Sequence, residues 1–287
     1  MLKGLYHNHT CLCDGHDAPR EMAQAAYDAG LGHFGFSGHM DHDIHMDWDE
    51  YVAQVKGVAD EWRGRMDVLL GVELDTLYGP GRACCPGAQY VIGSTHFVSA
   101  NDGRGPSVDN EPELFEQLCR DCYGGDWMAL TRDYYQVEAT VVERTGCDFI
   151  GHFDLVAKFN GAGASPLGKY FDESSREYLE PALETMELLV EQGKPFEVNS
   201  GAIARGYREV CYPRPELLRA LRRMGGQIIL STDAHSTQGV LGGLDVAVKQ
   251  AIDCGFTHAL YLASDGKGGV RFEEQPLDEA MGEKDVR

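Results

Sequence analysis

The sequence predicts an α/β barrel, because short apolar runs of strand length alternate with helical segments along most of the chain. We count seven to eight strand-helix units, which favours a closed barrel of parallel strands over an open sheet. Histidines and acidic residues recur where these strands end, and α/β barrels carry their chemistry at the carboxyl ends of their strands. Together these observations predict a barrel with one polar site at its mouth.

The expected strands are apolar runs bounded by turn residues, and several of them end in a histidine or a carboxylate. They lie at residues 3–9, 32–37, 67–73, 90–96, 147–152, 195–199, 227–235 and 257–262. The expected helices lie at residues 19–29, 49–59, 111–122, 132–145, 173–192, 215–224 and 239–253. Pro19 suits a first helical turn, and Gly30 and Gly193 suit helix ends.

The domain organisation follows from this alternation. Residues 1–265 are expected to form a single barrel domain, within which residues 99–130 are an excursion that forms a lid or surface insertion. The polar and acidic residues 266–287 are expected to be a loosely held C-terminal tail.

Composition excludes several classes of partner. A net charge of −21 leaves no basic stripe to neutralise phosphates, so nucleic acid and anionic membrane surfaces are disfavoured. No run approaches the roughly 18 apolar residues of a membrane span. The N-terminus enters a strand without a signal-peptide pattern, and the nine cysteines are odd in number and scattered. These features predict a cytoplasmic protein with reduced thiols. They leave its oligomeric state unknown.

The strand at 227–235 ends in Asp233-Ala234-His235, and the first strand ends in His7-Asn8-His9. Residues i and i+2 of a strand share a face, so each pair of side chains converges on one point. Carboxylates and imidazoles are metal ligands. The two strand ends therefore suggest one metal site built from opposite ends of the sequence.

A single histidine after a strand is more often a hydrogen-bonded core or loop residue than a ligand. Here, however, six histidines gather at predicted strand ends together with two acidic residues. These residues are His7, His9, His39, Glu73, His96, His152, Asp233 and His235. Buried together without a metal they would carry large desolvation costs, so the pattern predicts a metal centre.

A series of short motifs resembles those of the polymerase and histidinol phosphatase (PHP) superfamily, and the motifs occur in that family's order over nearly the whole chain. They are His7–Thr10, Asp14-Gly15, Gly35–His39, Gly71–Glu73, Ser94–His96, Gly151-His152 and Ser231–His235. The resemblance implies a distorted, TIM-like (β/α)7 barrel and a centre of three divalent metal ions (zinc, manganese or iron).

Two further stretches resemble the histidinol-phosphate phosphatase branch of this family, residues 151–159 and residues 197–205, the second followed by Tyr212–Pro215. The branch implies a phosphomonoesterase that converts L-histidinol phosphate to L-histidinol and phosphate, with a metal-bound hydroxide as the nucleophile. The alternative is a PHP phosphoesterase that acts on another phosphomonoester, a phosphodiester or a nucleotide.

The resemblance also assigns ligands. One metal would be held by His7, His9, Glu73 and Asp233, a second by Glu73, His96 and His152, and a third by His39, His235 and Asp14. Many relatives have Ser-Asp-Gly where this chain has Cys13-Asp14-Gly15, which favours Asp14; His16 is the alternative ligand in this loop. Gly38 is a departure, since many relatives have an acidic residue there.

Asp233 and His235 are the candidate catalytic residues that would protonate the leaving alkoxide, with a metal-bound water as another candidate donor. Lys158 and Arg205 are candidate ligands for the substrate phosphate, and Arg205 could bind it through a bidentate fork. Otherwise these two residues would be ordinary surface charges.

Two other functions compete with the phosphatase. A non-catalytic metal-binding barrel would be expected to lack some ligands, yet every motif position is filled. A proofreading exonuclease conflicts with the charge of −21. The mixed histidine and carboxylate ligands do not distinguish among zinc, manganese and iron.

Overall fold

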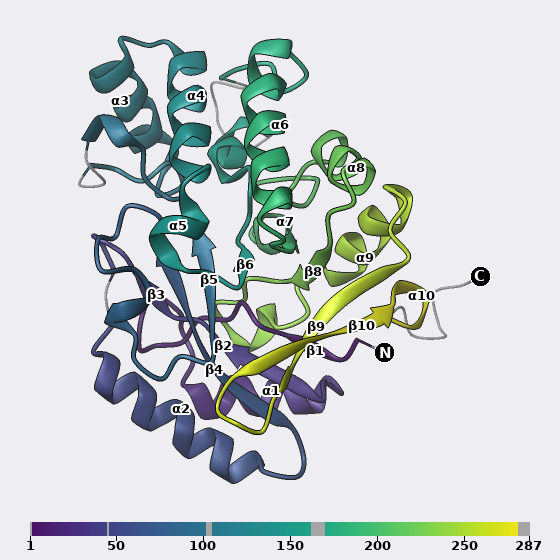
Figure 1. Ribbon diagram of the computed structural model, residues 1–287. Helices are drawn as coiled ribbons and strands as arrows, with labels where there is room; N and C mark the ends of the chain where they lie inside the picture. Colours follow the sequence, from purple (N-terminus) through teal and green to yellow (C-terminus); the bar gives the residue numbers. More distant parts are fainter. Residues whose placement is uncertain (1, 45, 102–104, 162–169, 281–287) are drawn as a thin grey trace.

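A computed structural model describes residues 2–44, 46–101, 105–161 and 170–280 (Figure 1). Its strands form one curled sheet in the order β1-β2-β4-β5-β6-β7-β8-β9-β10, with β3 paired to β4. Neighbours from β1 to β9 are parallel, and β10 is antiparallel to β9. The strands are β1 (Gly4–Leu5), β2 (His33–Phe36), β3 (His39–Met40), β4 (Asp67–Asp75), β5 (Tyr90–Ser94), β6 (Phe149–Ile150), β7 (Phe196–Asn199), β8 (Ile228–Ser231), β9 (His258–Ser264) and β10 (Val270–Pro276).

Helices pack around the strands, as Figure 1 shows for α2, α6, α8 and α9. The α-helices are α1 (Pro19–Asp28), α2 (Trp48–Trp62), α3 (Pro112–Tyr123), α4 (Trp127–Glu138), α5 (Val141–Thr145), α6 (Arg176–Glu191), α7 (Gly201–Ala204), α8 (Pro215–Arg223), α9 (Leu244–Asp253) and α10 (Leu277–Ala280). Short 3₁₀ helices are η1 (Gly81–Cys84), η2 (Ser99–Asn101), η3 (Leu155–Asn160) and η4 (Thr237–Gly239). Within the described residues, no helix combines the length and the apolar character needed to cross a membrane.

The sheet curls until the segment after β1 meets the segment after β8. The N–H of His9 donates to the carbonyl of Ala234 at 2.8 Å, and the N–H of Ala234 donates to the carbonyl of His7 at 3.3 Å. Asn8 and Ala234 thus form a parallel bridge. This contact brings the first and last ligand motifs of the sequence side by side at the carboxyl ends of the strands.

Beneath that end, the inside of the curled sheet is filled by apolar side chains. Leu69, Ile92 and Phe149 pack there with two tyrosines. The hydroxyl of Tyr90 donates to the carbonyls of Tyr6 at 2.5 Å and Phe36 at 2.9 Å, so its polar atom is satisfied although the ring is buried. The barrel interior is therefore a packed core that supports the site from below.

The structure confirms the predicted alternation of strands and helices, with local differences. The helix expected over residues 239–253 begins at Leu244, as α9, and the strand expected over residues 227–235 ends at Ser231, as β8. The first strand was expected over residues 3–9, but the ladder ends at Leu5 and only the bridge at Asn8 continues the pairing. The helix expected over residues 132–145 is instead α4, which starts at Trp127, followed by the separate α5. The excursion at 99–130 contains the expected helix, α3, and the start of α4.

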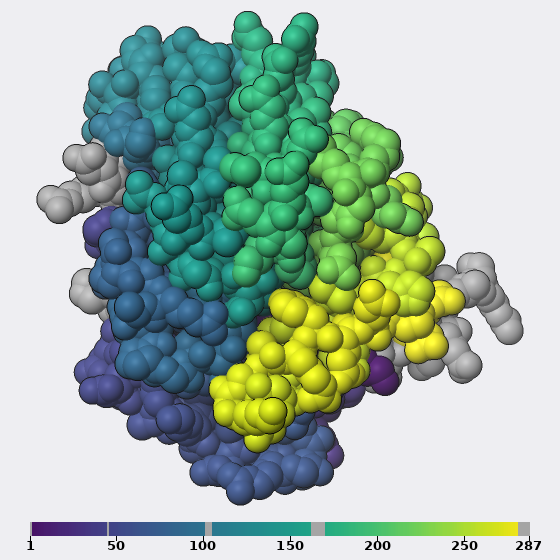
Figure 2. Space-filling view, in the orientation of Figure 1, coloured from purple at the N-terminus to yellow at the C-terminus, as the bar shows by residue number. Residues whose placement is uncertain are grey.

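The expectation of a loosely held tail is wrong for residues 266–280, while residues 281–287 lie outside the described chain. Residues 270–276 pair with β9 in register from Val270–Ser264 to Pro276–His258, and Leu277 is fully buried. Figure 2 shows these C-terminal residues, in yellow, packed against the body of the molecule. The polar composition is explained by the strand's position at the sheet edge, where one face meets solvent.

Candidate metal centre

Glu73, near the carboxyl end of β4, is the central carboxylate of a buried cluster. One oxygen, Oε2, lies 2.9 Å from His7 Nε2, 3.2 Å from His39 Nδ1 and 3.4 Å from His9 Nε2. The other oxygen, Oε1, lies 2.9 Å from His152 Nε2 and 3.4 Å from His96 Nε2. One carboxylate thus faces five imidazoles that come from four strand ends, His7 and His9 sharing the one after β1.

Asp233 contacts the same cluster from the segment after β8. Its Oδ1 lies 3.3 Å from His9 Nε2 and 3.7 Å from His7 Nε2. Asp233 has a φ of 49°, a conformation that L residues adopt at some cost in strain. The turn is supported by Arg205, which donates to the Asp233 carbonyl and to its Oδ2, both at 3.0 Å.

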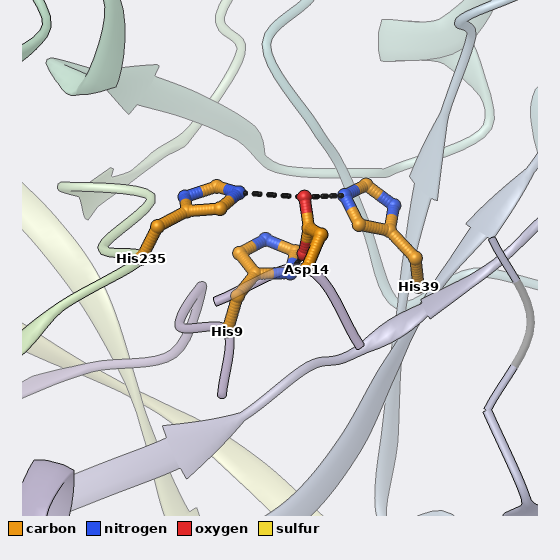
Figure 3. Close-up of side chains that lie close together, drawn as sticks. All are labelled: His9, Asp14, His39 and His235. Carbon is orange, nitrogen blue, oxygen red and sulfur yellow. Dashed lines mark hydrogen bonds and ion pairs between the residues drawn. The ribbon is translucent and has the colours of Figure 1, made fainter. Parts of the chain in front are cut away.

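The loop after β1 completes a third group, drawn in Figure 3. Asp14 Oδ2 lies 3.0 Å from His235 Nε2 and 3.6 Å from His39 Nε2, and its Oδ1 lies 3.4 Å from His9 Nδ1. His16, the alternative in this loop, is exposed and does not join the described ligand groups; its backbone N–H donates to the His235 carbonyl. The geometry therefore favours Asp14.

The histidine and carboxylate atoms are arranged as they would be around cations. Glu73 Oε2, His7 Nε2 and His9 Nε2 are buried and both nitrogens lie within ion-pair distance of the oxygen, yet none of the three atoms makes a hydrogen bond. Unpartnered buried polar atoms are costly, whereas each of these atoms would be satisfied as a ligand. Nitrogen and oxygen donors of this kind suit zinc, iron and manganese, so the residues fit a multi-metal site.

Electrostatic coupling keeps the acidic ligands ionised. Although burial opposes their charge, His7 and His39 hold the pKa of Glu73 well below its ordinary value, and Arg205 and His7 do the same for Asp233. Burial also opposes a charged His7, but the carboxylates of Glu197, Glu73 and Asp233 raise its pKa to about 10. Without metal, a proton on His7 thus balances part of the negative charge.

Two carboxylates that sequence reasoning did not assign as site residues hold ligands in place. Glu197 on β7 accepts from His7 Nδ1 at 2.8 Å and from the His152 N–H at 3.1 Å. Asp75 on β4 accepts the His96 N–H at 2.8 Å and lies 3.4 Å from its Nδ1. Carboxylates behind histidine ligands fix the ring orientation and leave the other nitrogen free for metal.

A cavity of about 340 Å³ opens above the cluster. Both predicted phosphate ligands line it, but both are already engaged. Lys158 on η3 donates to the Asp109 carbonyl at 2.5 Å and lies 3.2 Å from its Oδ2. Arg205, besides Asp233, lies 3.1 Å from His235 Nδ1. The sequence-predicted residues that border the cavity are Asp14, His39, Glu73, His96, His152, Lys158, Arg205, Asp233 and His235.

Comparison with known proteins decides the family. The PHP domain matches residues 6–201, which include most of the ligand cluster. The chain belongs to the PHP domain family. A family relative from Deinococcus radiodurans, named "Probable histidinol-phosphatase", is 33% identical over 267 residues, covering 87% of this chain and 92% of its own. A second, of the same name, from Schizosaccharomyces pombe is 25% identical over 236 residues, covering 79% and 74%.

Solved structures share the PHP chain's fold. The crystal structure of histidinol phosphate phosphatase from Lactococcus lactis, in complex with zinc, L-histidinol and phosphate, has a TM-score of 0.67 at 21% identity, covering 94% of this chain and 98% of that one. A Listeria monocytogenes protein assigned as a histidinol phosphatase has a TM-score of 0.72 at 17% identity, covering 85% and 99%. The predicted α/β barrel fold is thereby confirmed.

Proposed function

We propose that this PHP protein is a metal-dependent phosphomonoesterase that hydrolyses L-histidinol phosphate to L-histidinol and phosphate. The observation that carries the metal-dependent chemistry is the buried Glu73 carboxylate, which faces five imidazoles and whose Oε2, close to three of their nitrogens, makes no hydrogen bond. The relative with 33% identity over 87% of the chain supports the substrate.

We assign the ligands as three sets. His7, His9, Glu73 and Asp233 would hold one cation, Glu73, His96 and His152 a second, and Asp14, His39 and His235 a third. Zinc is favoured by the Lactococcus lactis complex, and the donors also suit manganese and iron. Divalent cations here would activate water and neutralise phosphate charge.

The remaining side chains orient the ester. Lys158 on η3 and Arg205 at the end of α7 line the cavity and would bind the phosphate oxygens. Asp233 and His235 also line it and are the groups that we assign to protonate the leaving alkoxide; because Asp233 is ionised at rest, it would first take up the proton that the attacking water releases. Ligation by His235 through Nε2 requires the proton on Nδ1, where the Asp233 carbonyl accepts it at 3.0 Å.

The test measures metal content and hydrolysis of L-histidinol phosphate beside generic phosphomonoesters. We expect bound metal, preferential turnover of L-histidinol phosphate, and loss of at least about a hundredfold in kcat/KM in Glu73→Gln, because that variant removes the bridging charge. The exposed Glu187→Gln is the matched control. Equal turnover of all esters would reject the substrate, and a metal-loaded protein that left every phosphoester intact would favour a non-catalytic barrel.

A further inference from the structure

Three carboxylates line the cavity without belonging to the proposed ligand sets: Asp41, Asp43 and Asp109. Asp41 is already hydrogen-bonded within its own loop, and Asp43 is exposed. Asp41 Oδ1 accepts the backbone N–H groups of Asp43 and Ile44, and its Oδ2 lies 3.6 Å from His39 Nδ1. Asp43 is exposed to solvent, where an ion pair contributes little. Asp109 is therefore the carboxylate best placed to bind a ligand.

Asp109 is fixed on the cavity wall. The preceding residue, Val108, donates its N–H to the His96 carbonyl at 2.8 Å, which ties this segment to a ligand-bearing loop. Lys158 Nζ contacts both the carbonyl and the carboxylate of Asp109, and the aspartate side chain is 23% exposed. Lys158 is itself held 5.0 Å from the ring centroid of Tyr207.

One carboxylate oxygen of Asp109 remains open to a ligand. The contact with Lys158 uses Oδ2, and no hydrogen bond to Oδ1 is present among the described residues. The cavity wall therefore presents an ammonium and a carboxylate as immediate neighbours, 3.2 Å apart. A ligand that carries an anion and a cation separated by a short spacer would complement both groups.

We propose that Asp109 is a specificity-determining residue that binds the ammonium group of the substrate, and so selects the phosphate ester of a β-amino alcohol, such as L-histidinol phosphate, over an ester that lacks the amine. This inference rests on the proposed phosphatase function. In such an ester two carbons separate the phosphate oxygen from the ammonium. The phosphate would lie between Lys158 and the metal centre, and the ammonium beside the Asp109 carboxylate.

The charge of the site makes this contact selective. Cations that bind phosphate repel an ammonium held close to it, unless a fixed carboxylate offsets that repulsion. Because Asp109 is partly buried, its attraction for the ammonium is screened less than that of an exposed acid. An ester without the amine would leave Asp109 paired only with Lys158. It would gain no binding energy from the Asp109 carboxylate.

The test compares L-histidinol phosphate with its desamino analogue, 3-(imidazol-4-yl)propyl phosphate, in the metal-loaded full chain. The quantity is the ratio of the two kcat/KM values. We expect the wild-type protein to favour the amino ester and Asp109→Asn to lower the ratio by about tenfold, mainly through KM of the amino ester. Asp43→Asn, which removes one exposed charge from the same cavity, should change the ratio by less than about twofold.

Asp109→Glu keeps the charge and serves as a second variant; it should retain more of the ratio than Asp109→Asn. Competitive inhibition by L-histidinol, compared with desamino-histidinol, measures amine binding apart from turnover and should weaken in Asp109→Asn. A ratio unchanged in Asp109→Asn, or lowered equally by Asp43→Asn, overturns the assignment while leaving the phosphatase intact. A wild-type protein that does not hydrolyse L-histidinol phosphate rejects the proposed function itself.

Discussion

At the scale of single residues, the site depends on how its histidines are oriented as much as on their number. An imidazole ligates through one nitrogen, and the group bound to the other nitrogen decides which one is free. For His7 that group is Glu197, whose side chain is 1% exposed and whose second oxygen accepts from His152 and from Asn199. Glu197 therefore positions two ligands at once.

We expect Glu197→Gln to lower metal affinity by about ten- to a hundredfold, because a neutral amide orients His7 less strongly and makes it a weaker donor. Metal titration followed by calorimetry measures the affinity directly. Glu191→Gln, at the end of α6 and exposed, is the matched control. A Glu197→Gln protein that binds metal as tightly as the control would show that the contact serves only packing. A role in positioning also predicts that saturating metal restores part of the activity.

Most of the candidate ligands were predictable because each ends or follows an apolar strand, and strand ends of a parallel barrel meet in space; Asp14, in the loop after β1, was assigned from the family resemblance. The supporting carboxylates were missed because single acids beside apolar residues also occur on solvated edges. The available signal was register: Asp75 follows Glu73 by two residues, and Glu197 lies between Phe196 and Val198 in a strand with both faces buried. The pairing of Lys158 with Asp109 had no comparable signal, since loop contacts depend on tertiary packing.

At the scale of elements, the C-terminal hairpin is part of the barrel structure. Gln275 on β10 accepts the backbone N–H of Lys3 at 2.8 Å, which links the end of the described chain to its beginning. Leu277 then enters the hydrophobic core. Sequence periodicity did not predict β10, because Gln275 is its only buried residue and the charged residues Arg271, Glu273 and Glu274 leave no apolar alternation.

We expect Leu277→Ala to lower the free energy of unfolding by about 2–4 kcal/mol, since it removes a fully buried side chain and leaves a cavity. Phe272, on the same hairpin, is 38% exposed, and Phe272→Ala should cost less than about 1 kcal/mol. Urea denaturation of both variants gives the comparison. Equal, small losses would mean that the hairpin end contributes little to the stability of the barrel.

At the scale of the whole molecule, a chain of net charge −21 must accept an anionic ester. In the metal-free site, protonated histidines offset part of the negative charge of the carboxylates. His7 is the clearest case, because the pKa of its imidazole is raised to about 10. A divalent cation would replace that proton and provide more positive charge at the same place. Binding of a metal ion should therefore release a proton from the protein.

The sign of this coupling gives a prediction for metal removal. In the metal-free protein, the folded pKa of His7 lies above the unfolded value of 6.5, so its stabilising contribution is complete below pH 6.5 and is lost as pH rises through about 10. Metal affinity should rise over the same range by about tenfold per pH unit for each proton displaced.

The gain in Tm on adding zinc to chelator-treated protein should then be larger at pH 8.5 than at pH 6.5. Calorimetry in two buffers of different ionisation enthalpy should detect the released proton. His7→Gln should reduce both signals, and a gain that falls with rising pH would contradict the exchange of a proton for metal.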